Sequence, residues 1–168
     1  MLKRLNFVTK LLQIGFLMGS HLLSKSSFIR GVQCEKHLYL YKYHYKEMDQ
    51  LSEMQKAIFK RGTDVGKLAQ QLFPNGIDAS PQTQFEYDKA VKLTKELLEK
   101  KQKVIYEASF SYSEVLSVAD IVVNEKSGLK VFEVKSSTSI SETYIRDAAL
   151  QYWVISNCGY KIKDFSIT

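Results

Sequence analysis

Three charged residues, Asp120, Glu133 and Lys135, stand in two apolar segments that are joined by a polar, glycine-containing turn. This pattern is typical of a β-hairpin. If Val123 pairs with Lys130, antiparallel counting places Asp120 opposite Glu133, with their Cβ atoms roughly 4.5–5.5 Å apart. The two-residue period of a strand then puts Lys135 on the same face. This register predicts two adjacent carboxylates with an ammonium group beside them.

Two carboxylates in these positions repel each other unless a cation neutralises them. A divalent cation with oxygen ligands is the obvious candidate, and we therefore predict Mg²⁺ or Mn²⁺ as the cofactor. The alternative is an exposed hairpin whose outer face carries acidic and basic side chains without any further role. The apolar surroundings of the motif, and the helix expected directly after it, favour a site over that alternative.

The elements that must position these residues follow from local patterns. Three segments are expected to form strands because they are rich in β-branched and aromatic residues: 104–110, 119–123 and 129–135. Ser139 and Glu142 form a capping box that opens a helix, and Gly159 is placed to end it. The segment 161–167 would then return as a parallel strand after a right-handed crossover. The buried stripe of that helix is expected at five positions: Ile145, Ala148, Ala149, Tyr152 and Ile155.

Earlier segments have helical patterns. We expect helices at 24–41, at about 47–59 and at 81–101, and an apolar-periodic segment at 68–73 that ends at the turn beginning with Pro74. The helix at 81–101 should bury one face, made of Phe85, Ala90, Leu93 and Leu97. Together these elements predict an α/β fold, with a short mixed sheet flanked by helices and an N-terminal helical portion.

Composition sets wider limits. A chain of 168 residues fits one domain, and its net charge of +6 suits a polyanionic partner. Cys34 and Cys158 are too few for a disulfide framework, so both are expected to be reduced in a cytoplasmic protein. Residues 1–20 combine a charged start with an apolar run too short to span a membrane, and we interpret them as an uncertain N-terminal extension or a first helix. The main domain is expected at 24–168, with a C-terminal truncation left open.

Several motifs occur in the order found in a known family: Gly62 to Ala69, Glu107 to Phe110, Asp120-Ile121, Glu133 to Thr138, and Gln151-Tyr152. With them the chain resembles the PD-(D/E)XK nucleases, in the RecB-like branch that includes CRISPR-associated exonucleases. It is most similar to an uncharacterised bacterial nuclease-like family. The resemblance covers roughly 24–168 and implies a restriction-endonuclease-like core.

The resemblance also implies roles at the hairpin. Asp120 and Glu133 would ligate Mg²⁺ or Mn²⁺, with the backbone carbonyl of Val134 as a further ligand. Lys135 would position or help deprotonate the attacking water, and it would stabilise charge on the phosphate. Glu107 is a candidate for an additional metal ligand. The alternative, equally favoured, is that Glu107 is a solvated strand carboxylate or the partner of a nearby lysine.

Gln151 and Tyr152, on the helix that follows, would support the site and the substrate backbone. The implied activity is metal-dependent hydrolysis of DNA phosphodiester bonds, as an exonuclease in repair or defence. Two departures from the family matter. Many relatives have a His ligand where Gly66 stands here. Either Asp64 would replace that missing ligand, or it would simply be an exposed helix carboxylate. Some relatives bind an iron–sulfur cluster through four cysteines, and two cysteines predict none here.

One further segment mixes basic and aromatic residues, from Lys36 to Lys46. Its aromatic rings would stack on nucleobases while its basic groups contact phosphates. The alternative is a helix that buries its Tyr and Leu side chains and leaves its lysines in water. The rival interpretation of the whole chain is a degenerate nuclease-like module that binds nucleic acid without cleaving it. A third is an accessory domain of a larger, helicase-linked complex.

Overall fold

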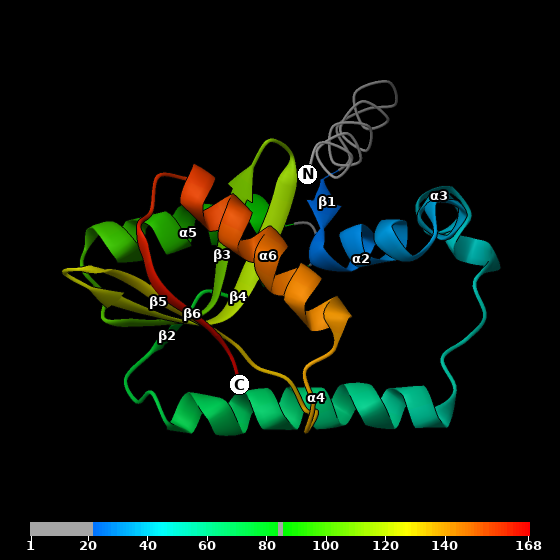
Figure 1. Ribbon diagram of the computed structural model, residues 1–168, viewed down its shortest axis with the longest axis horizontal. Coiled ribbons are helices and arrows are strands. Elements are labelled where there is room, and N and C mark those ends of the chain that lie inside the picture. Colours follow the sequence, from blue (N-terminus) through cyan, green and yellow to red (C-terminus); the bar gives the residue numbers. More distant parts are fainter. Residues whose placement is uncertain (1–21, 84–85) are drawn as a thin grey trace.

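The computed structural model describes residues 22–83 and 86–168, in which the expected strands form one mixed sheet with helices on both sides (Figure 1). The segment 1–20 and the residue Phe85 lie outside the described residues. The elements are β1 Leu23–Ser24, α2 Lys25–Gln33, α3 Glu35–Tyr43, the 3₁₀ helix η1 Tyr45–Glu47, α4 Glu53–Gln71, β2 Ile77–Asp78, α5 Tyr87–Glu99, β3 Val104–Tyr112, β4 Val115–Glu125, β5 Gly128–Glu133, α6 Glu142–Asn157 and β6 Ile162–Ile167. The predicted α/β class is confirmed.

The hairpin register is the one that the sequence predicts. Strands β4 and β5 are antiparallel, with Val123 paired with Lys130 and Ile121 paired with Phe132. Gly128 begins β5 with a φ of 135°, where a Cβ atom would come within 2.7 Å of the carbonyl oxygen of Lys161. Only glycine adopts this conformation at no steric cost, so the turn fixes the register of everything that follows.

The sheet has the order β2-β3-β4-β5-β6, and β1 pairs with the beginning of β4 outside this path. Strand β6 lies parallel to β5, so α6 is the connection of a β-α-β crossover, as predicted. Gly159 follows the end of α6 with a φ of 87° and reverses the chain toward β6. The crossover brings one face of α6 directly against the end of the hairpin.

The two faces of the sheet are covered differently. Helices α5 and α6 pack on one face, where Leu97, Val122 and Val154 belong to the larger buried cluster. On the other face a smaller cluster forms around Ile121, with Phe73 just beyond the end of α4 packed against it. Figure 1 shows α4 running along the far edge of the molecule, away from α5 and α6.

The N-terminal helices differ from the prediction. The expected helix 24–41 is two helices, because Cys34 is extended, with a φ of −164°, and α3 leaves in a new direction (Figure 1). The expected pieces around 47–59 and 68–73 are one helix, α4, which a capping box at Ser52 begins. Gly62 and Gly66 do not interrupt it, because a helix tolerates an internal glycine at a cost of about 1 kcal/mol.

Two helix starts were also predicted wrongly. Helix α5 begins at Tyr87 and not at Pro81, because the Asp78 side chain accepts hydrogen bonds from the amide and hydroxyl of Ser80 and holds a turn there. Helix α6 is capped by Ser141 and not by Ser139. Its predicted stripe was largely wrong, since Ile145, Ala149 and Tyr152 are exposed. The buried residues are Asp147, Leu150, Gln151, Val154 and Ile155.

Candidate functional site

Three carboxylates, Glu107, Asp120 and Glu133, occupy equivalent positions on β3, β4 and β5. Each is the immediate neighbour of one residue in a row that is paired across the three strands: Tyr106, Ile121 and Phe132. Glu133 lies on the face that α6 covers, because its carboxylate accepts a hydrogen bond from Gln151. Asp120 and Glu107 lie near it, because the charge of Glu133 acts on both of these carboxyls. The three carboxylates therefore form a row beside the crossover helix.

Glu107 and Asp120 lack full compensation for their charges. Burial raises the pKa of Glu107 to about 7, and the nearby negative charge of Asp120 adds to the effect. Burial likewise raises the pKa of Asp120 to about 6, with a further contribution from Glu133. Carboxyls with raised pKa values keep their proton to a higher pH than usual, and a nearby cation favours their ionised form. Both groups would therefore gain from a cation placed among them.

The backbone is irregular at Glu107. Its φ is 52°, in the left-handed region that a residue with a Cβ rarely adopts. The ladder between β3 and β4 joins Tyr106 to Ile121 and Ala108 to Ala119, but it omits Glu107 and Asp120 between them. Strained backbone of this kind costs about 1–3 kcal/mol and is found mainly at functional sites. This strain therefore supports Glu107 as a member of the site.

Glu133 is 1% exposed and has the most partners of the three carboxylates. The Lys25 ammonium lies 3.0 Å from Oε1 and 3.1 Å from Oε2, and the Lys135 ammonium lies 2.5 Å from Oε1. The Gln151 amide donates to Oε2 at 2.7 Å. Burial alone would raise the pKa of Glu133, but the two ammonium groups hold it below its usual range. Glu133 is therefore ionised.

Lys135 lies on the predicted face and connects the strand to α6. Its ammonium donates to Oδ2 of Asp147 at 2.9 Å, as well as to Glu133. Burial lowers the pKa of Lys135, but the two carboxylates raise it by more, so the group remains protonated near neutral pH. An ammonium in this state donates hydrogen bonds and stabilises negative charge, and it does not remove a proton from water.

Gln151 completes the network from α6. It is fully buried, and its amide nitrogen also donates to Oδ1 of Asp147 at 3.3 Å. Its Oε1 has no hydrogen-bond partner among the described residues. A buried amide oxygen without a partner is costly and marks a position where a donor, such as a water molecule or a ligand group, would be stabilising.

Val134 takes part through its amide. The N–H of Val134 donates to Oδ2 of Asp120 at 2.6 Å. On the next residue, the amide of Lys135 donates to the carbonyl of Thr168, while the amide of Thr168 donates to the carbonyl of Glu133. The end of β6 thus fixes the backbone that carries Glu133 and Lys135. The role of the Val134 carbonyl as a metal ligand stays a prediction.

The structure does not bring every predicted residue to this place. Tyr152 is 49% exposed and its ring neighbours Phe165 of β6, 6.5 Å away between centroids. Asp64 is exposed on α4, and a Cβ atom at Gly66 would meet nothing within 4 Å. The end of α4 reaches the sheet on the Phe132 face, and the replacement of the missing histidine by Asp64 stays a prediction.

Sequence reasoning missed two members of the network, Lys25 and Asp147. Asp147 had a signal, because it stands four residues before Gln151 and therefore on the same helix face. Lys25 had none, because it reaches Glu133 across 108 residues of sequence. It is the first residue of α2, whose N-cap Ser24 belongs to the short strand on β4.

The donor atoms in this network are of the kind that would suit Mg²⁺ or Mn²⁺. Carboxylate oxygens are the ligands these cations prefer, and the raised pKa values of Glu107 and Asp120 show two that need a positive partner. Among residues 22–83 and 86–168, however, no three His, Cys, Asp or Glu side chains converge closely enough to hold a metal ion as they stand. Lys25 and Lys135 instead occupy the oxygens of Glu133.

Fold and site together define an α/β protein with a buried carboxylate–lysine network at the end of a β-hairpin, covered by a crossover helix. Comparison with known proteins adds no family: no family model, no curated protein and no solved structure matches the chain. In the part of the chain that the structure describes, no helix is long and apolar enough to cross a membrane.

Proposed function

We propose that this chain is a metal-dependent nuclease of the PD-(D/E)XK type, with a restriction-endonuclease-like core, that hydrolyses DNA phosphodiester bonds. One observation carries the proposal: Asp120, Glu133 and Lys135 lie on one buried face, in the hairpin register that the motif requires. The crossover helix adds Gln151 to the same network, as the resemblance implies.

Asp120 and Glu133 would hold Mg²⁺ or Mn²⁺, with Glu107 and the Val134 carbonyl as further ligands. When bound, the cation would polarise the phosphodiester and lower the pKa of the attacking water. Lys135, being protonated, would orient that water and stabilise the charge that develops on the phosphate. Asp147 would keep Lys135 in place and Gln151 would keep Glu133 in place, because each accepts from or donates to that residue directly.

Helix α3 supplies a surface for the rest of the substrate. Tyr39 is 54% exposed and stacks near Tyr43, with 5.0 Å between ring centroids, while Arg30 lies 3.9 Å over the ring of Tyr41. None of the described residues of α3 is buried, so its aromatic rings do not serve the core. Exposed rings beside basic groups are suited to stacking on the bases of a single strand.

The test is cleavage of labelled single- and double-stranded DNA in Mg²⁺, Mn²⁺ or EDTA. We expect cleavage that requires the metal and falls by roughly 10²–10³-fold in Lys135→Met. The matched control is Lys163→Met, which removes a lysine paired with Glu125 at 2.8 Å at the far end of the hairpin. Equal rates in the two variants, or cleavage that persists in EDTA, would contradict the proposal.

A second candidate function is a nuclease-like module that binds nucleic acid without cleaving it. The hydrogen bonds that Glu133 accepts from Lys25, Lys135 and Gln151 favour it, because a carboxylate with four close contacts from three donor groups has little need of a metal. This candidate predicts DNA binding that weakens with salt, persists in EDTA and leads to no cleavage of a folded protein.

A further inference from the structure

We propose that the Lys25 ammonium occupies the cation position beside Glu133, and that a divalent metal binds this site by displacing it. This inference deepens the proposed function, since it rests on the same carboxylates. It assigns Lys25 as the residue that decides whether Glu133 is available to a metal.

The contacts of Lys25 resemble those of a bound cation. Its ammonium touches both oxygens of Glu133, at 3.0 and 3.1 Å, and lies 4.0 Å from Oδ1 of Asp147. Its positive charge also acts on Asp120 and on Glu107, the other two carboxylates of the row. One ammonium therefore contacts Glu133 directly and acts at longer range on the other two carboxylates of the candidate metal site.

Lys135 differs from Lys25 in this respect. Lys135 belongs to the chain segment that carries Glu133 and is also held by Asp147 on α6, so its position is fixed by the sheet and the crossover. Lys25 comes from the N-terminal helix, outside the sheet and the crossover, although its side chain is about as exposed as that of Lys135 (24% against 21%). Of these two cations, Lys25 is the one that can leave without moving the strands.

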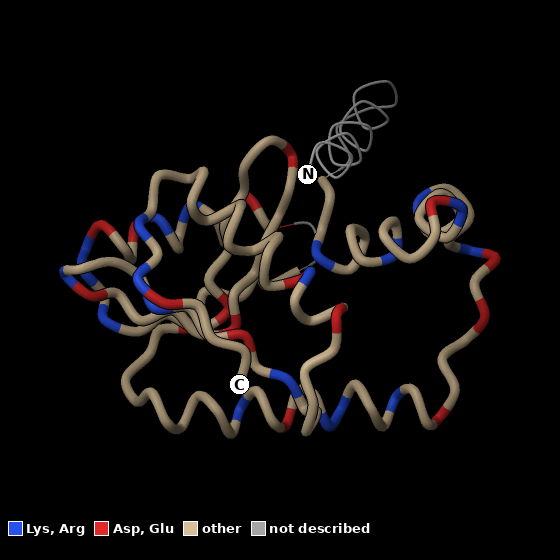
Figure 2. The backbone as a smooth tube through the Cα atoms, viewed as in Figure 1, with Lys and Arg blue, Asp and Glu red and all other residues tan. Residues whose placement is uncertain are grey.

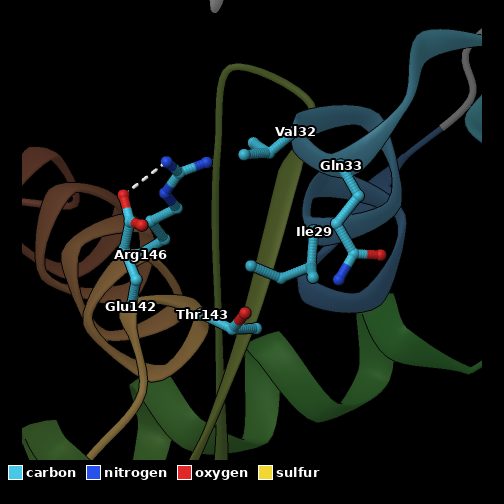
Figure 3. A pocket seen from close by; sticks show the side chains of 6 residues that line it. All are labelled: Ile29, Val32, Gln33, Glu142, Thr143 and Arg146. Atoms are coloured by element: carbon cyan, nitrogen blue, oxygen red, sulfur yellow. Dashed lines mark hydrogen bonds and ion pairs between the residues drawn. The ribbon is translucent and has the colours of Figure 1, made fainter.

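The helix that carries Lys25 meets α6 beside an open pocket. A shallow pocket separates α2 from α6, lined by Ile29, Val32 and Gln33 on one side and by Glu142, Thr143 and Arg146 on the other (Figure 3). The guanidinium of Arg146 is paired with Glu142 of its own helix at 2.5 Å and not with α2. Because Phe28 of α2 packs against the main core, the displacement would move the Lys25 side chain and leave α2 in place.

A metal ion and the Lys25 ammonium cannot share the oxygens of Glu133, because each needs the same lone pairs and the two positive charges repel. Metal affinity is then reduced by the free energy of the Lys25 contacts. Removing the ammonium frees both oxygens and leaves Glu107, Asp120 and Glu133 with less positive charge among them. Both changes favour a divalent cation.

The experiment is calorimetric titration of Mn²⁺ into the whole chain, without substrate. We expect Lys25→Met to bind Mn²⁺ roughly tenfold more tightly than the wild type. Lys25→Arg, which keeps the positive charge, should stay close to the wild type. Lys163→Met removes the same charge far from the site and should also leave the affinity unchanged. Affinity in Lys25→Met that is equal to or weaker than that of the wild type, or no binding at all, would overturn the inference.

A second measurement needs no variant. If Mg²⁺ displaces Lys25, its amine becomes more reactive toward an acetylating reagent, and mass spectrometry of peptides can follow that one residue. We expect faster labelling of Lys25 in Mg²⁺ and unchanged labelling of Lys163. Labelling of Lys25 that Mg²⁺ leaves unchanged or slows would contradict displacement, even if Lys25→Met failed to fold.

These results are separable from the proposed function. Tight Mn²⁺ binding by Lys25→Met without DNA cleavage by any form would support the inference and reject the nuclease. Metal-dependent cleavage by the wild type, with unaltered affinity in Lys25→Met, would support the nuclease and reject the inference.

Discussion

The carboxylate face of the sheet and helix α4 distribute their residues in opposite ways. At the carboxylate face, charged and polar groups such as Glu133 and Gln151 are fully buried. In α4, none of the described residues is buried. Even its large apolar side chains Phe59 and Leu68 are 60% and 63% exposed. Figure 2 shows both acidic and basic positions along α4, with uncharged stretches between them.

This difference in burial indicates which part of the chain contributes most to stability. Burying charge is expensive unless it is paired, so the network around Glu133 persists because each member has partners. Exposed apolar residues cost little one by one and give α4 little hold on the rest of the molecule. Changes at the network should therefore have large effects, and matched changes on α4 should have small ones.

The largest effect on folding is expected for Glu133→Gln. Removing this carboxylate takes from the ammonium groups of Lys25 and Lys135 their closest shared partner, and breaking a buried pair in this way costs about 3–5 kcal/mol. Chemical denaturation measures the change. The matched control is Glu125→Gln, which loses exposed ion pairs with Lys130 and Lys163 and should change the unfolding midpoint little. Equal effects would remove the contrast between buried and exposed pairs.

A comparable but smaller contrast is expected between two apolar residues. Ile155→Ala empties a fully buried position between α6 and the sheet and should cost roughly 2–4 kcal/mol. Phe59→Ala removes a larger side chain from α4, yet it should cost less than about 0.5 kcal/mol, because that ring is already in water. Thermal unfolding of both variants gives the comparison. A large loss in Phe59→Ala would show that α4 is packed in solution.

Stability should also fall as pH rises. In the folded protein the pKa is about 7 for Glu107 and about 6 for Asp120, so the folded state holds protons that the unfolded state has released above about pH 4.5. Folding is therefore favoured by these groups at pH 5.5 relative to pH 8. Glu133, with a lowered pKa, opposes this only at more acidic pH.

In EDTA we expect a melting temperature roughly 5 °C higher at pH 5.5 than at pH 8. Glu107→Gln should flatten this dependence, because it removes the group with the more strongly raised pKa. A melting temperature that climbs toward pH 8 in the wild type would contradict the assignment.

The smallest effect is expected for Gly66→Ala on α4. A Cβ atom there meets nothing within 4 Å, and alanine favours a helix by about 0.5–1 kcal/mol over glycine. Because α4 has few contacts with the rest of the protein, the gain should be local. Amide hydrogen exchange should slow in α4 and stay unchanged in β4. Slower exchange throughout the sheet would mean that α4 unfolds together with it.

The hairpin was predictable because its information is local. The turn and the alternation of side chains fix the register, and the register places Asp120, Glu133 and Lys135 on one face. The predicted stripe of α6 failed because it assumed that only apolar residues face the sheet, whereas the network requires Asp147 and Gln151 to face inward. Neither Lys25 nor the left-handed backbone of Glu107 carries a local signal, because both depend on contacts formed by distant segments.

The distance in sequence between Lys25 and Glu133 has a consequence for how the protein folds. Contacts between neighbouring segments form faster than those that close long loops. A refolding chain can therefore assemble the β3–β4–β5 meander before the helix that carries Lys25 arrives. During that interval the three carboxylates face one another without this ammonium, and the intermediate should be more sensitive to pH and to added divalent cations than the finished protein.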